Sequence, residues 1–128
     1  MISNSNVVLV VDDSIDSIHM LNDVLEDAKF TVLVALEGAQ ALTITQNIRP
    51  DIILLDAVMP GIDGFDTTKI IRELDGDYFK KLPIIALTAS TLHNEHKKFK
   101  ESGMDGHVLK PFNPNEIKEV LNQFFATL

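Results

Sequence analysis

Hydrophobic residues in this chain are grouped into two kinds of segment that alternate along its length. Short apolar runs, rich in β-branched residues, occur at Val7–Val11, Thr31–Ala35, Ile52–Leu55, Ile84–Leu87 and His107–Leu109, the last being the shortest. Runs that are apolar at successive positions bury both faces, which is typical of parallel strands covered by helices. The pattern therefore predicts a strand at each run.

The stretches between these runs carry apolar residues at helical spacing. The clearest is the last, which follows the i, i+3, i+4, i+7, i+8 pattern at Ile117, Val120, Leu121, Phe124 and Phe125. Earlier helices are indicated by Ile18, Leu21, Val24, Leu25 and Ala28, by Ala41, Ile44 and Ile48, and by Ile70, Ile71 and Leu74. We expect a further helix in the polar stretch 90–103, with Leu92 and Phe99 as apolar anchors and Gly103 as its C-cap.

Strand and helix alternate five times, which predicts an α/β fold of the (βα)5 type, a doubly wound five-stranded parallel sheet. Right-handed crossovers leave the flavodoxin-like strand order 2-1-3-4-5 as the natural topology. The second helix should end before Pro50, because the residue preceding a proline avoids the α region. Residues 74–83 are expected to form a long loop. We expect one domain over residues 1–128, with residues 1–6 as a flexible N-terminal segment.

The composition excludes several classes of function. Acidic residues outnumber basic ones by 19 to 11, and the resulting net charge of −8 argues against direct binding of nucleic acid. The chain has no cysteine, which excludes disulfides and thiolate metal sites. No apolar run reaches the ~20 residues of a membrane span, and the polar start MISNSN lacks the layout of a signal peptide. We therefore expect a cytoplasmic protein with no membrane association.

Polar residues follow the predicted strands at the ends where a site would form. Asp12 and Asp13 come after the first strand, Asp56 after the third, Thr88 after the fourth and Lys110 after the fifth. In parallel α/β sheets, sites lie outside the carboxyl ends of the strands, near the switch in strand order. Two aspartates after a strand would by themselves more often form a solvated turn. It is the succession of polar residues at strand ends that points to one site.

These residue types favour phosphoryl chemistry. Three carboxylates in one pocket repel each other, so they would either raise each other's pKa values or need a cation between them. A donor set made only of oxygens suits Mg²⁺. An aspartate beside such a cation can act as a nucleophile and become an aspartyl phosphate. Lys110 would offset charge on the transferred oxygens, and Thr88 would donate a hydrogen bond to them.

Four motifs together resemble the receiver domains of bacterial two-component response regulators, which are CheY-like domains. They are VVDDS at 10–14, LLDAVMPGIDG at 54–64, ALTAS at 86–90 and LKPF at 109–112. The resemblance covers essentially the whole chain. It implies that Asp56 accepts a phosphoryl group from a histidine kinase or a phosphotransfer protein. Such a domain promotes only its own phosphorylation and dephosphorylation, so the resemblance implies a switch and not an enzyme with a separate substrate.

The resemblance also implies a role for each residue of the site. Asp13 and Asp56 would bind Mg²⁺ together with the backbone carbonyl of Val58, and Asp12 would act mainly through metal-bound water.

The remaining residues of the site would hold the phosphoryl group. Lys110 and Thr88 would contact the phosphoryl oxygens, helped by the backbone N–H of Ala89. The resemblance further implies a cis peptide between Lys110 and Pro111, which is acceptable because the second residue is a proline.

Three positions are expected to tune the switch. This family often carries Tyr or Phe three residues before the lysine, and here that position is His107. Switching is therefore hypothesised to be weaker or pH-sensitive, the alternative being a tolerated surface residue. Val58 and Ser90 occupy the positions that set the lifetime of the phosphoryl group. Because Val58 cannot orient an attacking water, we expect slow to moderate dephosphorylation.

The polar helix in residues 90–103 is the expected partner surface. The resemblance places output or homodimerisation on the face formed by the fourth predicted helix, the fifth strand and the fifth helix. His93 and His96 are expected to be solvated and not a metal pair, and Lys97, Lys98 and Lys100 to be a polar face and not a nucleic-acid patch. Since the chain ends directly after the last helix, we favour a domain taken from a longer regulator or hybrid kinase over a stand-alone receiver.

Two other classes of function are compatible with part of the pattern. A phosphatase of the haloacid dehalogenase type also uses Asp, Mg²⁺, Thr and Lys, but it needs an aspartate where this chain has Val58, and a cap domain. A flavodoxin-like cofactor binder needs a phosphate cradle, whereas the loop after the first strand is acidic. Both are less favoured than the receiver.

Overall fold

The computed structural model describes residues 6–59, 61–89 and 93–125, and residues 93–96 are described by their backbone alone. Its strands form one parallel sheet in the order β2-β1-β3-β4-β5. They are β1 (Val7–Val11), β2 (Thr31–Ala35), β3 (Ile52–Asp56), β4 (Ile84–Thr88) and β5 (Gly106–Leu109). The helices are α1 (Ile15–Asp27), α2 (Gly38–Ile48), α3 (Gly64–Glu73), α4 (Asp77–Lys81), α5 (His93–Ser102) and α6 (Pro114–Phe125). The predicted fold class and strand order are confirmed.

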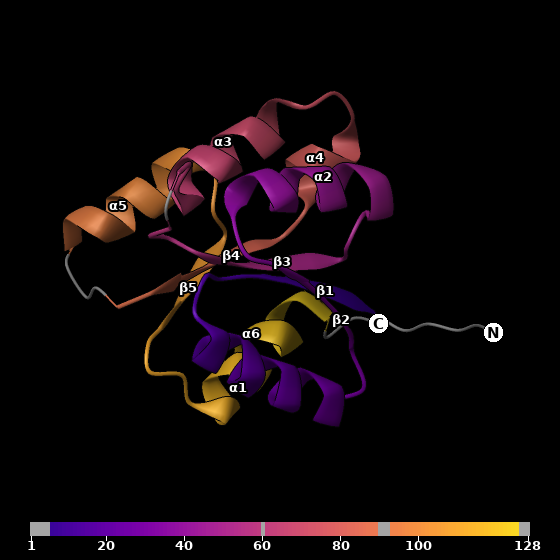
Figure 1. Cartoon of the computed structure of the whole chain (residues 1–128). Coiled ribbons are helices and arrows are strands. Elements are labelled where there is room, and N and C mark those ends of the chain that lie inside the picture. Colours follow the sequence, from indigo (N-terminus) through magenta and orange to yellow (C-terminus); the bar gives the residue numbers. More distant parts are fainter. Residues whose placement is uncertain (1–5, 60, 90–92, 126–128) are drawn as a thin grey trace.

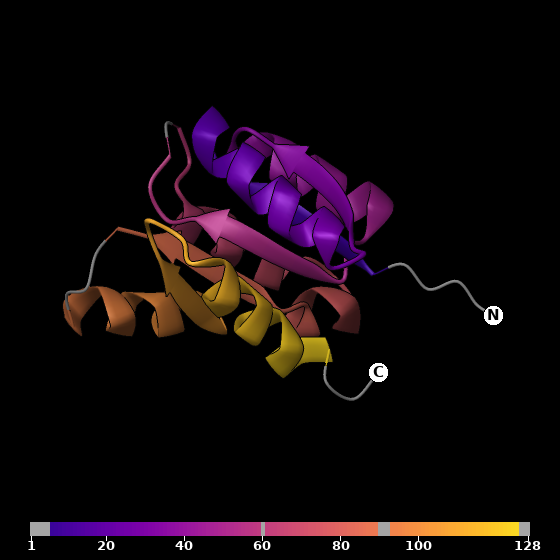
Figure 2. The same ribbon diagram turned by 90° about the horizontal axis from the view of Figure 1, so that it is seen from below.

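The helices cover both faces of the sheet. α1 and α6 lie on one face, and α2, α3, α4 and α5 lie on the other (Figures 1 and 2). Because successive side chains of a strand point to opposite faces, each inner strand supplies both cores. Val8 and Val10 of β1 pack in the core that contains Leu21 of α1, whereas Leu9 and Val11 pack in the core of the opposite face.

Some predictions of burial are wrong. β2 is an edge strand, and its Val34 is 40% exposed, so this strand is not buried on both faces. On the helices, Ile48 and Ile70 are 55% and 39% exposed. In α2 the buried residue near the C-terminal end is Thr45. The apolar pattern located these helices without identifying every inward-facing residue.

The stretch predicted to be a long loop, residues 74–83, contains the short helix α4, so this prediction is also wrong. Phe79 is buried there, and the Tyr78 ring meets it edge-on with centroids 4.9 Å apart. The Tyr78 hydroxyl donates a hydrogen bond to the Pro50 carbonyl at 2.5 Å. A helix of five residues is too short to show an apolar period, which explains why the sequence pattern missed it.

Side-chain caps begin the two helices that follow the acidic strand ends. The Ser14 hydroxyl accepts a hydrogen bond from the Ser17 N–H at the start of α1. Asp63 accepts one from the Asp66 N–H at the start of α3, at 2.9 Å. Such caps satisfy N–H groups that have no partner within the helix. Gly103 follows α5 with a φ of 100°, as expected of a C-cap glycine.

Three smaller predictions can also be followed in the structure. The peptide between Lys110 and Pro111 is cis, as the resemblance implied. No helix in the described ranges is long and apolar enough to cross a membrane. Of the segment 1–6, expected to be flexible, residues 1–5 lie outside the described residues.

Candidate functional site

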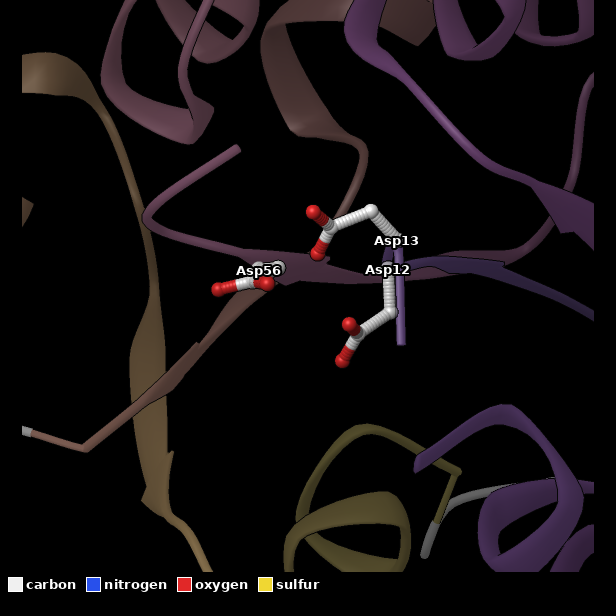
Figure 3. Close-up of side chains that lie close together, drawn as sticks. All are labelled: Asp12, Asp13 and Asp56. Atoms are coloured by element: carbon white, nitrogen blue, oxygen red, sulfur yellow. The ribbon is translucent and has the colours of Figure 1, made fainter. Parts of the chain in front are cut away.

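The carboxyl edge of the sheet brings the predicted site residues together. β3 lies between β1 and β4, so Asp56, its last residue, is central. Asp12 and Asp13 directly follow β1, Thr88 ends β4 and Lys110 directly follows β5. Figure 3 shows the side chains of Asp12, Asp13 and Asp56 close together. One oxygen from each lies within 4.8 Å of the others.

The three carboxylates differ in burial and in backbone contacts. Asp12 is fully buried, Asp56 is 6% exposed and Asp13 is exposed. The Ser14 N–H donates a hydrogen bond to Asp12 Oδ1 at 2.9 Å, and the Val58 N–H donates one to Asp56 Oδ1 at 3.1 Å. These hydrogen bonds fix the orientation of the two buried carboxylates.

The second oxygens of the buried carboxylates face Lys110. Its Nζ lies 3.0 Å from Asp12 Oδ2 and 3.3 Å from Asp56 Oδ2. Within the described part of the chain, Asp12 Oδ2 accepts no hydrogen bond of good geometry, so the ion pair with Lys110 is its polar contact. Burial by itself would lower the pKa of Lys110, but the carboxylates of Asp12 and Asp56 outweigh it and raise that pKa. Lys110 therefore remains a cation.

Asp56 is in an environment that disfavours its negative charge. Burial raises the pKa of Asp56, and the nearby Asp12 carboxylate raises it further. The hydrogen bond from the Val58 N–H and the charge of Lys110 act in the opposite direction without cancelling this effect. A buried carboxylate with a raised pKa, placed beside a specific charge partner, is typical of a functional site.

The donor set fits a divalent cation. Three carboxylates and one ammonium give this small space a formal charge of −2, counted with every group in its charged form. Their ligand atoms are oxygens, which Mg²⁺ prefers, and Asp12 Oδ2 still has capacity to accept a hydrogen bond from a metal-bound water. The exposed Asp13 leaves the site open to solvent, as an ion that keeps several waters requires.

The start of α3 packs directly against the end of β3. The Gly64 N–H donates a hydrogen bond to the Ala57 carbonyl at 3.1 Å. A Cβ atom on Gly64 would lie 2.4 Å from the Asp56 carbonyl oxygen and 2.9 Å from Ala57 Cα. Only glycine allows an approach this close. The position of α3 and that of Asp56 are therefore coupled.

The structure brings other predicted residues to the same edge without testing their roles. Thr88 is 4% exposed, and Ala89 after it is exposed. The Val58 side chain is on the surface, at 75% exposure. Ser90 lies outside the described residues. The parts assigned to these residues in phosphoryl binding and lifetime stay predictions.

His107 lies on the edge strand β5. It is exposed, and its ring stacks on Phe99 of α5 with centroids 5.6 Å apart and planes at 27°. The hypothesis of weaker or pH-sensitive switching at this position stays a prediction.

The charged residues of α5 are partly engaged within the domain. Lys97 pairs with Glu101 across one turn at 3.9 Å, and Lys98 Nζ lies 4.4 Å from the ring centroid of Phe65. The side chains of His93 and His96 lie outside the described residues, so the expectation of a solvated pair stays a prediction.

Sequence reasoning missed Arg72, which joins three segments on the side of the sheet that carries α3. Its Nε and Nη2 donate to the Gly103 carbonyl at 3.0 and 2.8 Å, and Nη2 also contacts Asp105 Oδ2 at 2.9 Å. Its Nη1 donates to the carbonyls of Phe79 and Leu82 at 2.9 and 2.7 Å. Only its position on a predicted helix was visible in the sequence, because its acceptors are backbone atoms of distant loops.

The sequence matches the receiver domains of response regulators and of hybrid histidine kinases. The sequence profile of the response regulator receiver domain matches residues 8–122, most of the chain. The DNA-binding response regulator MtrA of Mycolicibacterium smegmatis is 40% identical over 110 residues, which is 86% of this chain and 46% of that protein. The hybrid signal transduction histidine kinase I of Dictyostelium discoideum is 36% identical over 120 residues, 90% of this chain and 7% of that protein. The chain thus spans about half the length of the curated regulators it matches.

Solved structures show the same fold. The chemotaxis response regulator CheY4 of Vibrio cholerae superposes with a TM-score of 0.88 at 35% identity, covering 94% of this chain and 99% of that chain. The receiver domain of a sensor histidine kinase from Pseudomonas aeruginosa has a TM-score of 0.87 at 28% identity, covering 96% and 99%. That structure holds a magnesium ion coordinated in its active site cleft.

Proposed function

The chain belongs to the response regulator receiver domain family, whose members are phosphoacceptors, and on that premise we propose that Asp56 accepts the phosphoryl group. The donor would be a phosphohistidine on a histidine kinase or a phosphotransfer protein. The observation that carries this proposal is the position of Asp56. It is a buried carboxylate at the centre of an acidic cluster, with an ammonium 3.3 Å from its Oδ2.

The transfer itself would exchange one bond for another. A carboxylate oxygen of Asp56 forms a bond to phosphorus while the P–N bond of the donor breaks. The electron pair of that bond stays on the imidazole nitrogen, which takes up a proton. Asp56 must be ionised to attack, so Lys110 assists by favouring the charged carboxylate.

Lys110 has a second task once transfer has begun. In the structure its ammonium pairs with both Asp12 and Asp56. Phosphorylation converts the Asp56 carboxylate into an acyl phosphate and moves the negative charge outward onto the phosphoryl oxygens. Lys110 would follow that charge, while Thr88 and the Ala89 N–H donate hydrogen bonds to the other oxygens.

Asp13, Asp56 and the backbone carbonyl of Val58 would hold Mg²⁺, and Asp12 would hold one of its waters. A bound Mg²⁺ supplies positive charge that screens the carboxylates from the incoming anion. The close approach of the three carboxylates and the related magnesium-bound receiver domain support this assignment.

The lifetime of the phosphoryl group would be set in part by Val58. Its side chain is 75% exposed and carries no polar atom that could orient an attacking water. We therefore expect a phosphoryl lifetime well beyond seconds. Val58→Asn should shorten that lifetime about tenfold by supplying such a group, whereas Val58→Leu should leave it unchanged. The measurement is the decay of the phosphorylated mass after removal of the donor, and decay within seconds in the wild type would contradict it.

We favour a switch over a phosphatase. The haloacid dehalogenase type needs an aspartate at the position that Val58 occupies, and that side chain points to the surface. The proposed chemistry is confined to Asp56 of the chain itself. Phosphorylation would then shift an equilibrium between two conformations of the domain.

The partners and the location are proposed from the family. The output or dimerisation face predicted from the sequence corresponds to α5, β5 and α6 in the structure. The matched regulators include DNA-binding proteins, but the match covers only about half of their length. We propose that this domain binds no nucleic acid itself, acts in the cytoplasm and passes its signal through contact with another domain or a second copy.

The test uses phosphoramidate, a small donor whose P–N bond resembles that of phosphohistidine. The protein is incubated with this donor and Mg²⁺ and is then reduced with borohydride, which converts an aspartyl phosphate into homoserine. Peptide mass spectrometry should place the homoserine at position 56 and at no other aspartate. Asp56→Asn is the control and should show no conversion. Conversion at Asp12 or Asp13 would overturn the assignment.

A further inference from the structure

The start of α2 is packed against the start of α3 at Gly38, where there is no room for a side chain. Gly38 is the first residue of α2 and is buried, and the two helices lie on the same face of the sheet (Figure 1). A Cβ atom on Gly38 would lie 2.4 Å from Thr67 Oγ1 and 2.6 Å from Ile62 Cγ1. Both distances are shorter than any ordinary contact of a Cβ atom, so the close approach of the helices requires a glycine.

The requirement at Gly38 is for space and not for an unusual backbone conformation. Gly38 belongs to the regular part of α2, and alanine forms helices more readily than glycine does. The helix by itself therefore does not explain the glycine. Thr67 is held in place because its hydroxyl donates a hydrogen bond to the Asp63 carbonyl at 2.8 Å. The contact between α2 and α3 is the feature that explains this residue.

The first turn of α3 links Gly38 to the backbone of Asp56. In that turn the Thr68 hydroxyl donates a hydrogen bond to the Gly64 carbonyl at 2.8 Å. The Gly64 N–H donates to the Ala57 carbonyl at 3.1 Å, and the Gly64 backbone is packed against the Asp56 carbonyl. A side chain at position 38 that displaced this turn would therefore also displace the backbone of Asp56.

The end of β2 holds the other buried carboxylate of the site. The Asp12 N–H donates a hydrogen bond to the carbonyl of Ala35, the last residue of β2, at 3.1 Å. Ala35 is fully buried and lies three residues before Gly38. The short segment 35–38 thus contacts the backbone of Asp12 directly and reaches that of Asp56 through α3. The relative position of the two buried carboxylates depends on this segment.

We propose that Gly38 is a positioning residue for the Mg²⁺ site. By allowing α2 to approach α3, it holds the backbones of Asp12 and Asp56 in the places from which their carboxylates converge. Mg²⁺ tolerates little deviation from octahedral geometry, so a shift of one carboxylate relative to the other lowers affinity for the ion. The inference rests on the Mg²⁺ site proposed above.

The test titrates Mg²⁺ into the protein and follows the backbone amide signals of Asp13 and Val58 by NMR, which also shows whether each variant is folded. Gly38→Ala should raise the Kd for Mg²⁺ about tenfold, the effect of disturbing a group that orients a metal ligand. Ile84→Val is the matched control, because Ile84 is fully buried in the core on the same side of the sheet and begins β4, away from the carboxyl edge. It should lower stability and leave the Kd unchanged.

A second set of variants tests whether the contact at Gly38 is itself responsible. Ile62→Ala together with Thr67→Ala removes the side chains that a Cβ atom at position 38 would meet. In that background Gly38→Ala should change the Kd by less than about twofold, because the crowding is gone. If Gly38→Ala alone does not fold, Gly38→Ala with Ile62→Ala keeps the contact with Thr67 and should bind Mg²⁺ more weakly than Ile62→Ala alone.

The contrary outcomes separate this inference from the proposed function. An unchanged Kd in folded Gly38→Ala would overturn the positioning role, as would a weakening that persists without the side chains of Ile62 and Thr67. Absence of Mg²⁺ binding to the wild type would overturn the positioning role together with the metal site. A wild type that binds Mg²⁺ and stays unmodified at Asp56 by mass spectrometry would refute the phosphoacceptor function, while a tenfold weaker Gly38→Ala would still support the positioning role.

Discussion

At the scale of single residues, Asp56 is in an environment where a charged carboxylate lowers the stability of the fold. Asp56 is 6% exposed, and one oxygen each of Asp12 and Asp13 lies within 4.8 Å of an oxygen of Asp56. Burial and the Asp12 charge together raise the pKa of Asp56. Functional sites often carry such a cost in stability. The consequence is that neutralising this residue should stabilise the domain when no metal is bound.

Asp56→Asn tests this consequence. The amide oxygen can still accept the hydrogen bond from Val58, so the change removes charge and keeps the contact. In metal-free buffer at neutral pH we expect the variant to gain about 1 kcal/mol in the free energy of unfolding. Urea denaturation measures it. Addition of Mg²⁺ should stabilise the wild type more than the variant, and a variant less stable than the metal-free wild type would contradict the account.

The same pair of proteins should show a specific pH dependence. Because the pKa of Asp56 is raised in the fold above its ordinary value of 3.8, the folded state binds its proton more tightly than the unfolded chain does. This contribution to stability is present below pH 3.8 and is lost as pH rises through the raised pKa. The stability advantage of Asp56→Asn should therefore grow with rising pH, and an advantage that shrinks would contradict the direction of the shift.

At the scale of elements, α3 connects Asp56 to the opposite end of the sheet. It begins at Gly64, against the Asp56 carbonyl, and its last turn carries Arg72. Arg72 is hydrogen-bonded to carbonyls before β4 and after α5, and it pairs with Asp105, which also accepts a hydrogen bond from the Ile84 N–H. α3 is therefore held at its start by the packing of the Gly64 backbone and at its end by hydrogen bonds from the Arg72 side chain to backbone carbonyls.

Arg72→Ala should lower the free energy of unfolding by about 2–3 kcal/mol, because several partly buried carbonyls lose a charged donor. Arg72→Lys should recover little of this loss, since an ammonium cannot reproduce the fork of a guanidinium. Lys69→Ala on the same helix is exposed and should change stability by less than about 0.5 kcal/mol. Denaturant unfolding gives all three values, and an Arg72→Ala effect as small as that of Lys69→Ala would be contrary to this account.

Gly64→Ala should affect both stability and phosphorylation. The new Cβ would meet the Asp56 carbonyl oxygen at 2.4 Å, so α3 or the end of β3 must shift, at a cost of about 1–3 kcal/mol. Gly106→Ala is the control, because its Cβ would lie 3.4 Å from the Ile85 side chain, far less crowded than at Gly64. The rate of phosphorylation by acetyl phosphate should fall in Gly64→Ala and stay near the wild-type rate in Gly106→Ala. Equal rates in the two variants would show that the close approach does not position Asp56.

An element could be predicted from the sequence where neighbouring residues determine it, and could not where contacts between distant segments determine it. The strands and α6 follow from apolar periodicity, and the carboxyl-edge position of Asp12, Asp56 and Lys110 follows from the parallel topology. α4 is too short to carry a period, and the exposure of Val34 follows from the edge position of β2. Contacts such as that of Arg72 with the Gly103 carbonyl join segments far apart in the chain, and no local pattern encodes them.

At the scale of the whole molecule, the negative charge of the chain and of the site indicates that phosphorylation requires a bound cation. The chain carries a net charge of −8, and within that total the site gathers three carboxylates against one ammonium. A phosphoryl donor is itself an anion, so its approach is opposed by the domain and by the site. A divalent cation at the carboxylates removes the local part of that repulsion. Phosphorylation should therefore depend strictly on Mg²⁺.

The central claim is that Asp56 is phosphorylated in a site that needs Mg²⁺. Its most direct test is the intact mass after incubation with acetyl phosphate, for the wild type and Asp56→Asn, with Mg²⁺ and with EDTA in excess. We predict one added phosphoryl group on the wild type with Mg²⁺, and none with EDTA or on the variant. An equal gain on Asp56→Asn, or a gain that persists in EDTA, would contradict the account, as would an unmodified wild type.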